Sequence, residues 1–206
     1  MLDMDQGTPE WLQARCGLIT ASKISAVMSK GRGSAPSATR ATYMAELVAE
    51  RLTGNPTAGF TNSSMDWGTE TEPQARAEYT MRTGNMVEEV AFVPHPSLQK
   101  AGASPDGLVS KEGLVEIKCP NTSTHIATLL GGPIKSGYRL QMQWQMACTG
   151  RKWCDFVSFD PRMPDDMAYH CTRVERDNDE ISAITIAVSA FDAELEALIE
   201  NLKEAT

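Results

Sequence analysis

Three ionisable residues stand close together in a stretch of the chain that otherwise favours β-strands. Nine residues separate Asp106 from Glu116, and Lys118 follows two positions later. Side chains two residues apart in a strand project from the same face, roughly 7 Å apart. Glu116 and Lys118 therefore share one face, whereas Val115 and Ile117 point to the other. A carboxylate and an ammonium in a short apolar strand are costly unless they are paired or used.

These residue types suit metal-assisted hydrolysis. A hairpin between the two segments would bring Asp106 beside Glu116. Two carboxylates and the Ile117 carbonyl suit Mg²⁺, which keeps water in its remaining positions. Lys118 beside the metal would hold an attacking water and help to deprotonate it, because nearby positive charge stabilises hydroxide. A simpler interpretation makes Asp106-Gly107 a turn and Glu116 and Lys118 an ion pair on a solvated face, and spacing alone does not decide between the two.

The elements that must position these residues follow from the hydrophobic pattern. The pattern predicts strands at 86–95, 102–110, 114–118, 153–160 and 168–174. It predicts helices at about 20–30, 39–53, 66–83, 121–130, 136–149 and 177–204. This order favours an α/β fold with a central mixed sheet flanked by helices. At 206 residues, we expect one domain over 1–206.

The C-terminal helix is expected to be acidic and amphipathic. Its apolar stripe should comprise Ile184, Val188, Phe191, Leu195, Leu198 and Leu202. From residue 165 to the end there are eleven acidic and three basic residues, a balance of −8 that equals the charge of the whole chain. A DNA-binding surface must therefore be local, since the overall field does not attract DNA.

Composition excludes several classes of protein. Hydrophobic residues make up 41% and charged residues 22% of the chain, which indicates a globular protein. No apolar run is long enough to span a bilayer, and no secretory signal is visible at the start. The five cysteines are dispersed and form no C-x-x-C pair. We therefore expect a reduced, cytoplasmic protein without a membrane partner.

Five further segments occur in a characteristic order around the Asp106 and Glu116 region. They are Trp11 with Arg15-x-Gly17-x-Ile19-Thr20-Ala21-Ser22, Trp67-Gly68-x3-Glu72, Glu116-Ile117-Lys118-Cys119-Pro120, Gln141-x-Gln143 and Asp160-Pro161-Arg162-Met163. With Pro105 and Asp106 they resemble the phage lambda exonuclease family of the PD-(D/E)xK nuclease superfamily, the alkaline exonucleases and YqaJ-type recombinases. The resemblance runs from about residue 8 to residue 176 and implies a restriction-endonuclease-like fold.

The resemblance implies roles for particular residues. It places metal ligands at Asp106, Glu116 and the Ile117 carbonyl, and a water-positioning lysine at Lys118. It also assigns Glu72 to a second metal ion and Gln141 to the active site. Taken alone, Glu72 would be a solvated carboxylate and Gln141 a surface amide. Two Mg²⁺ ions per site are implied, with Mn²⁺ as an alternative.

A pocket for a 5′ phosphate is also implied by the resemblance. Its residues are Arg15, Ser22, Arg32 and Ser104, and guanidinium and hydroxyl groups suit a terminal phosphate. Either arginine would otherwise be ordinary surface charge. Lambda-type sequences tend to carry another arginine after the Cys-Pro pair, and this chain does not. Either His125 replaces it or one phosphate contact is missing.

The function implied is Mg²⁺-dependent 5′→3′ exonuclease activity on one strand of double-stranded DNA, leaving 3′ overhangs for recombination. The resemblance further implies a homotrimeric ring around DNA, a single-strand annealing protein as partner, and a phage or prophage protein in a bacterial cytoplasm. The alternatives are an endonuclease or junction resolvase on the same fold, and a DNA-end-binding module without catalysis. The intact Asp106, Glu116 and Lys118 argue against the last.

Overall fold

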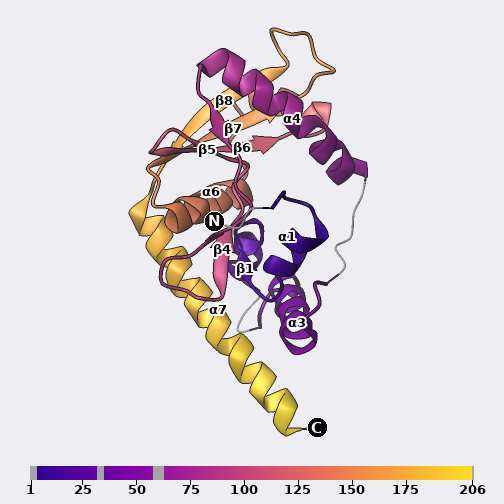
Figure 1. The fold of residues 1–206 in the computed structure, drawn as a ribbon, viewed down its shortest axis with the longest axis vertical. Helices are drawn as coiled ribbons and strands as arrows, with labels where there is room; N and C mark the ends of the chain where they lie inside the picture. Colours follow the sequence, from indigo (N-terminus) through magenta and orange to yellow (C-terminus); the bar gives the residue numbers. More distant parts are fainter. Residues whose placement is uncertain (1–3, 32–34, 58–62, 206) are drawn as a thin grey trace.

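A five-stranded mixed sheet forms one half of the molecule (Figure 1). The computed structural model describes residues 4–31, 35–57 and 63–205. The strands, in their order across the sheet, are β2 (Val87–Glu88), β5 (Gly107–Val109), β6 (Gly113–Lys118), β7 (Trp153–Phe159) and β8 (Tyr169–Glu175). β6 and β7 are parallel, and the other neighbours are antiparallel. The expected mixed sheet is confirmed.

Three shorter strands form a second sheet. They are β1 (Ile19–Thr20), β4 (Ala101–Ala103) and β3 (Val93–Pro94), with β4 in the middle. The predicted continuous strands at 86–95 and 102–110 are wrong, because each divides between the two sheets. Pro105 has no N–H to donate to a ladder, and the chain changes sheets there. The Ala91 carbonyl is bonded by the side chains of Trp11 and Ser104.

Two helices cover opposite faces of the larger sheet. α4 (Ser63–Thr83) lies on one face and α6 (Ser136–Thr149) on the other (Figure 1). Successive residues of β6 alternate between two apolar clusters. Leu114 packs in the cluster that contains Trp144 of α6, and Val115 packs in the one that contains Tyr79 of α4. The α6 face of the sheet therefore also carries Glu116 and Lys118.

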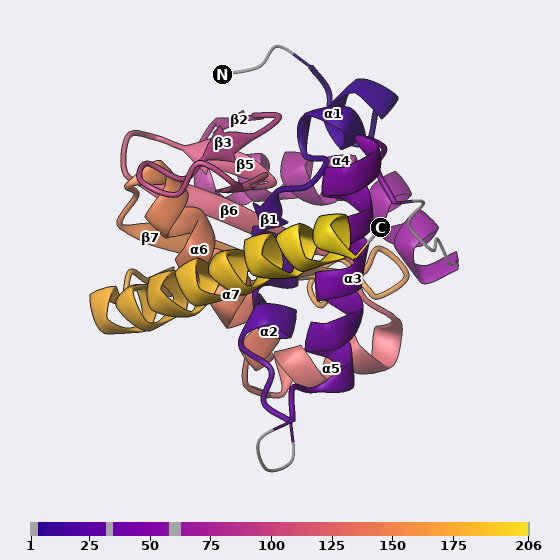
Figure 2. The same ribbon diagram turned by 90° about the horizontal axis from the view of Figure 1, so that it is seen from below.

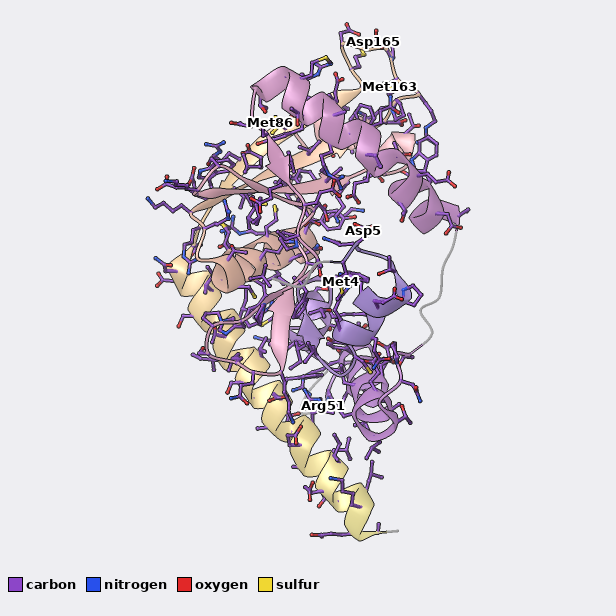
Figure 3. All side chains as sticks on the ribbon, in the orientation of Figure 1. Met4, Asp5, Arg51, Met86, Met163 and Asp165 are labelled. Carbon is purple, nitrogen blue, oxygen red and sulfur yellow. The ribbon has the colours of Figure 1, made fainter. Side chains whose placement is uncertain are left out.

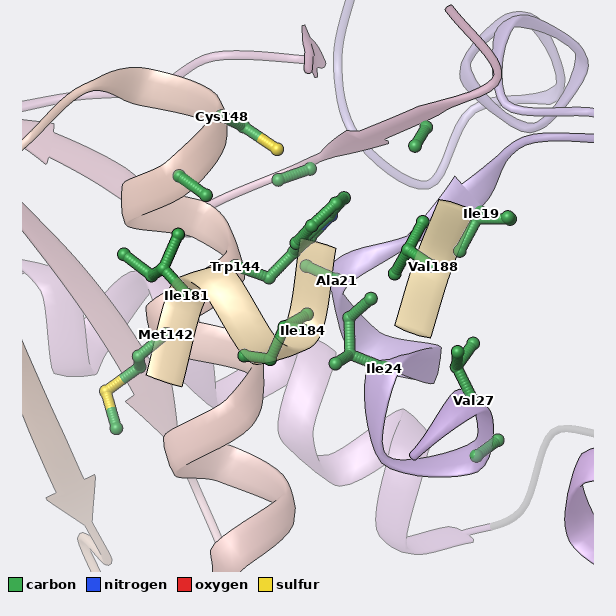
Figure 4. Packing of buried hydrophobic residues seen from close by; sticks show 14 of the residues in the cluster. Ile19, Ala21, Ile24, Val27, Met142, Trp144, Cys148, Ile181, Ile184 and Val188 are labelled. Carbon is green, nitrogen blue, oxygen red and sulfur yellow. The ribbon is translucent and has the colours of Figure 1, made fainter. Parts of the chain in front are cut away.

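The N-terminal elements are α1 (Pro9–Ala14), the 3₁₀ turn η1 (Ala21–Lys23), α2 (Ile24–Val27) and α3 (Ala38–Thr53). η1 and α2 pack against α6, whereas α3 packs against α2 and α7. Figure 4 shows Ile24 and Ala21 meeting Trp144 and Ile184 in the main core. The helix predicted from about 20 to 30 is shorter than expected, and α1 was not predicted. α3 begins after the Ser37 N-cap and ends at Gly54, whose φ of 69° favours glycine.

The long C-terminal helix α7 (Asn178–Glu204) begins at the predicted position, with Asp177 as its N-cap. It crosses the molecule beside α3 and α6 (Figure 2). Two residues of its predicted stripe are wrong: Leu198 and Leu202 are 40% and 41% exposed, while Ile199 is buried. A helix repeats every 3.6 residues, so the buried line moves from Leu195 to Ile199 rather than to Leu198.

Ion pairs hold part of the acidic face of α7 against α3. Arg51 bonds Asp192 at 2.7 Å and also bonds Glu196, and Figure 3 places it between the two helices. Arg40 bonds Glu194 at 2.9 Å. These two arginines of the N-terminal half are therefore occupied by the C-terminal acidity. Among the described residues, no helix is both long and apolar enough to cross a membrane.

Candidate active site

The hairpin of β5 and β6 brings Asp106 to Glu116, as predicted. Gly107 pairs with Val115, so Asp106 lies one step before the paired strand, at the level of Glu116. The Ile117 N–H donates to Asp106 Oδ2 at 2.6 Å. This bond fixes one carboxylate oxygen against the strand and leaves Oδ1 for another partner.

The Glu116 carboxylate is fully buried and held by three donors. Gln141 Nε2 donates to Oε1 at 2.7 Å, and Gln145 Nε2 donates to Oε2 at 2.6 Å. Lys118 forms an ion pair with Oε1. Gln141 and Gln145 are four residues apart on α6, so they lie on the same helix face, toward the strand. The sequence prediction placed Gln141 in the site but missed Gln145, which this spacing would have suggested.

Gln143, the other glutamine of the Gln-x-Gln motif, has a different place. It is fully buried. Its Nε2 donates to the Glu175 carbonyl at 2.9 Å, and its Oε1 accepts from the Asp177 N–H at 2.9 Å. Gln143 thus joins α6 to the end of β8 and the start of α7, away from Glu116.

The charges of the site are strongly coupled. Burial raises the pKa of Asp106 well above its usual value, and repulsion from Glu116 raises it further. Burial acts to lower the pKa of Lys118, but attraction to Glu116 and Asp106 prevails and raises it. The Lys118 ammonium can orient a water and stabilise negative charge.

A cavity of about 750 Å³ lies beside this cluster, and Ile117 and Lys118 line it. Glu72 of α4 lines the same cavity. Burial raises the pKa of Glu72, although Arg76 acts to lower it. Arg76 bonds Glu72 at 2.6 Å and Glu89 at 2.7 Å. The predicted Glu72 is thus brought to the site, with its carboxylate held by Arg76.

Two of the sequence motifs meet on another wall of the cavity. The Arg162 guanidinium lies 4.4 Å from the centre of the Trp67 ring. Asp160 is fully buried and accepts from Arg162 Nε at 2.7 Å and from the Thr122 hydroxyl at 2.7 Å. Burial acts to raise the pKa of Asp160, but the hydrogen bonds prevail and lower it to about 2. Asp160 is therefore ionised at neutral pH and holds Arg162 at the cavity wall.

The donor set fits a hard divalent cation. Asp106 and Glu116 offer carboxylate oxygens, and Ile117, the residue after Glu116, lines the cavity. Two neighbouring carboxylates whose repulsion raises the pKa of Asp106 would be stabilised by a cation between them. Among the described residues, no three His, Cys, Asp or Glu side chains converge closely enough to hold a metal ion. The candidate ligands are two carboxylates and a backbone carbonyl, which with water make the type of site that Mg²⁺ prefers.

Part of the predicted phosphate pocket adjoins this site. Arg15 stacks on Trp11, with its guanidinium carbon 3.8 Å from the ring centre. Trp11 Nε1 donates to Ser104 Oγ at 3.2 Å, and Ser104 lies two residues before Asp106. Burial lowers the pKa of Arg15 to about 10, which leaves it charged, and its Nε is buried without a partner among the described residues. Arg15 and Ser104 are therefore brought together through Trp11.

The remaining predictions for this pocket differ in outcome. Ser22 is exposed on η1, and its hydroxyl lies 3.5 Å from that of Thr20. Arg32 lies outside the described residues. The suggestion that His125 replaces a phosphate-binding arginine is wrong. His125 is fully buried, with Nδ1 2.8 Å from Ser158 Oγ and Nε2 2.8 Å from the Met167 carbonyl. His125 lies on the buried face of α5 (Thr122–Leu129), so its ring points into the core.

Residues 10–152 match the model of the YqaJ-like viral recombinase domain, which spans the candidate site from Trp11 to Gln145. The chain belongs to this family. The resemblance inferred from the motifs is thereby confirmed. No curated protein is significantly similar to the chain.

Solved structures agree with this assignment. The chain is 55% identical to the alkaline exonuclease LHK-Exo from Laribacter hongkongensis, covering 96% of this chain and 97% of that one, with a TM-score of 0.89. LHK-Exo in complex with dAMP matches with the same identity and coverage and a TM-score of 0.90. A phage-related exonuclease from Haemophilus somnus 129PT is 18% identical, over 90% of this chain and 96% of that one, with a TM-score of 0.68, and is alike in fold. The expected restriction-endonuclease-like fold is confirmed.

Proposed function

We propose that the protein is a Mg²⁺-dependent exonuclease that degrades one strand of double-stranded DNA from its 5′ end. The family and the 55% identity to an alkaline exonuclease support a DNA exonuclease. The observation that carries the chemical assignment is the cluster of Asp106, Glu116 and Lys118, in which Gln141 and Gln145 bond Glu116 and Lys118 lines the cavity. This arrangement supplies two carboxylates for a metal ion and a neighbouring ammonium group.

The roles of the chain's own groups follow from these contacts. Asp106, Glu116 and the Ile117 carbonyl would hold Mg²⁺, with Mn²⁺ as an alternative and Glu72 beside a second ion. When bound, the metal ions supply an activated water and neutralise charge on the phosphate. The Lys118 ammonium, 25% exposed and held by Glu116, orients the attacking water and stabilises the charge that develops in the transition state. Gln141 and Gln145 keep the Glu116 carboxylate in one orientation.

The 5′ polarity is proposed from the cluster around Arg15. The guanidinium of Arg15 retains a buried, unpartnered Nε, and Ser104 lies between Trp11 and Asp106. A terminal phosphate at Arg15, Ser22 and Ser104 would place the next phosphodiester toward the metal ligands. LHK-Exo binds dAMP, a deoxynucleoside monophosphate and thus the kind of product that such an enzyme releases.

We further propose a homotrimeric ring, a single-strand annealing protein as partner, and action on DNA ends in the cytoplasm of a bacterial host during phage recombination. The charge distribution of the chain supports a ring that encloses DNA. The chain has a net charge of −8, and Arg40 and Arg51 are paired with α7. A closed ring stays on the DNA that it encircles, so it needs fewer contacts between basic residues and phosphates than a protein held by charge alone. Light scattering should give the mass of three chains, and a processive monomer would contradict the ring.

The test compares three substrates: a linear duplex with a 5′ phosphate, the same duplex with a 5′ hydroxyl, and a closed circular plasmid. We expect Mg²⁺-dependent release of mononucleotides from the phosphorylated linear duplex, slower release from the hydroxyl end, and an intact plasmid. Glu116→Gln should abolish release, because the substitution removes a charged metal ligand. Cleavage of the closed plasmid would instead indicate an endonuclease, and release only from 3′ ends would contradict the polarity.

A further inference from the structure

A second, smaller cavity lies beside the active-site cavity. Its volume is about 150 Å³, and its walls come from α5, the connection to α6, the start of α6 and β7. Most of the lining is apolar, including Ala127, Pro133, Ile134, Tyr138 and Phe156. We call this space the side chamber. An apolar cavity of about this volume accepts a planar aromatic ring, and a larger ring system can extend into the cavity that the chamber adjoins.

The side chamber adjoins the catalytic cavity and shares part of its wall. Lys118, Pro120, Thr124, Lys135 and Tyr138 line both spaces. A group bound in the chamber would therefore lie next to the proposed catalytic ammonium. A molecule that fills the chamber has room to extend into the larger cavity, toward the metal ligands.

The mouth of the chamber is cationic and aromatic. Lys118 Nζ and Lys135 Nζ lie 5.2 and 5.8 Å from the centre of the Tyr138 ring. Tyr138 in turn stacks on Phe156, with 6.0 Å between ring centres and 27° between planes. Such a mouth selects a planar, apolar group attached to an anion, since the ring enters the chamber and the lysines remain beside the negative charge.

Polar groups inside the chamber are already engaged. Ser158 Oγ lies 2.8 Å from His125 Nδ1, and the Thr128 hydroxyl donates to the Thr124 carbonyl at 3.1 Å. The chamber therefore offers stacking and apolar contact rather than a hydrogen-bonding pattern that would distinguish one heterocycle from another. Stacking without such a pattern tolerates every base.

The start of α6 approaches the elements that carry Ser22 of the proposed phosphate pocket. Gly137, next to Tyr138, faces α2, and a Cβ on it would lie 3.6 Å from Ser25 Cβ. α2 directly follows η1, which carries Ser22. A nucleotide with its phosphate near Ser22 thus has the wall of α6 within reach.

We propose that the side chamber receives the base of the 5′-terminal nucleotide, which stacks on Tyr138 while its backbone crosses the catalytic cavity. This proposal rests on the exonuclease function proposed above and extends it. The chamber fixes the terminal nucleotide before cleavage and holds the mononucleotide after it. Because a stacked base raises affinity about tenfold or more, removal of the terminal base should slow the reaction about tenfold.

The test uses two 5′-phosphorylated duplexes that differ only at the terminal residue, deoxyadenosine in one and an abasic tetrahydrofuran residue in the other. Single-turnover release of the first residue at subsaturating enzyme should be about tenfold slower for the abasic end. Ala127→Phe, which fills the chamber, should slow the deoxyadenosine end to the abasic rate and leave the abasic end unchanged. Ile126→Phe is the matched control: Ile126 is the neighbouring residue of α5, 39% exposed, and does not line the chamber. Ile134→Phe is a second filling variant in case Ala127→Phe unfolds.

Equal wild-type rates on the two ends would overturn the side-chamber proposal while leaving the exonuclease function intact. A preference for the base that survives in both filling variants would overturn it as well. If neither end is cleaved, the exonuclease function fails, and calorimetry then tests the chamber separately. The wild type should bind dAMP about tenfold more tightly than 2-deoxyribose 5-phosphate, and filling variants should lose this difference; equal affinities in the wild type would overturn the proposal.

Discussion

Replacing Gln145 with leucine should weaken the use of Mg²⁺ more than it weakens the fold. Gln145 is fully buried, and its Nε2 donates to Glu116 Oε2 at 2.6 Å. A hydrogen bond to a charged group contributes about 1.5–3 kcal/mol. Gln145 Oε1, however, is buried without a partner among the described residues, which already costs about 1–3 kcal/mol. Gln145→Leu removes both terms, so the net change in the free energy of unfolding should be about 1 kcal/mol or less.

The metal site responds differently because Glu116 loses the donor that orients its second oxygen. Removing an outer partner of a metal ligand typically lowers metal affinity 10–100-fold. We therefore expect the half-saturating Mg²⁺ concentration for nucleotide release to rise at least about tenfold in Gln145→Leu, equivalent to about 1.4 kcal/mol. The rate at saturating Mg²⁺ should fall less, since Asp106 and Lys118 remain in place.

Gln143→Leu is the matched control. Gln143 is equally buried on the same helix, but it bonds the backbone of Glu175 and Asp177. Its loss leaves two half-buried backbone groups without this partner, which should cost about 1–2 kcal/mol in a urea titration. Its Mg²⁺ titration should match the wild type. An unchanged Mg²⁺ dependence in Gln145→Leu, or an equal shift in Gln143→Leu, would refute this reasoning.

Three other predictions concern neighbouring groups. Lys118→Ala should lose most turnover while affinity for DNA, measured by fluorescence anisotropy, changes only a few-fold, because the ammonium acts in the transition state; a large loss of affinity would contradict that role. Arg15→Ala should shrink the preference for a 5′-phosphorylated over a 5′-hydroxyl duplex, and an unchanged ratio of rates would remove Arg15 from the pocket. Asp160 has its pKa lowered to about 2, so its charge stabilises the fold fully above the unfolded pKa of about 4, and this contribution declines as pH falls toward 2. The gap in urea midpoint between wild type and Asp160→Asn should therefore be wider at pH 6 than at pH 3, and a constant gap would show that charge is not the cause.

Short-range periodicity explains which parts of the site were predictable. The two-residue period of a strand places Glu116 and Lys118 on one face, and the structure has them so. Two antiparallel strands can be joined by a short turn. The short spacing between Asp106 and Glu116 therefore predicted a hairpin that brings the two residues together. The boundaries of α5, α6 and α7 were close to prediction because Asn121, Gly150 and Asp177 are strong caps.

Longer-range features were not predictable in this way. The strands expected at 86–95 and 102–110 each divide between two sheets. Between β2 and β3, the Ala91 carbonyl is bonded by the side chains of Trp11 and of Ser104, the residue after β4, instead of by a neighbouring strand. His125 follows a proline turn that suits a surface group, yet α5 packs against β7 and buries the ring. Such outcomes depend on which elements meet, and no local pattern encodes that.

By itself, the sequence determined the family and which residues could meet as Asp106, Glu116 and Lys118 do, because spacing along a strand and the order of motifs are properties of the chain alone. The tertiary structure decided which groups surround that cluster. It placed Gln145 on Glu116, directed Gln143 to the end of β8, and left Arg162 at the cavity wall. The physical reason is that a helix or strand specifies its own faces, whereas the partner that each face buries is chosen by packing across the whole molecule.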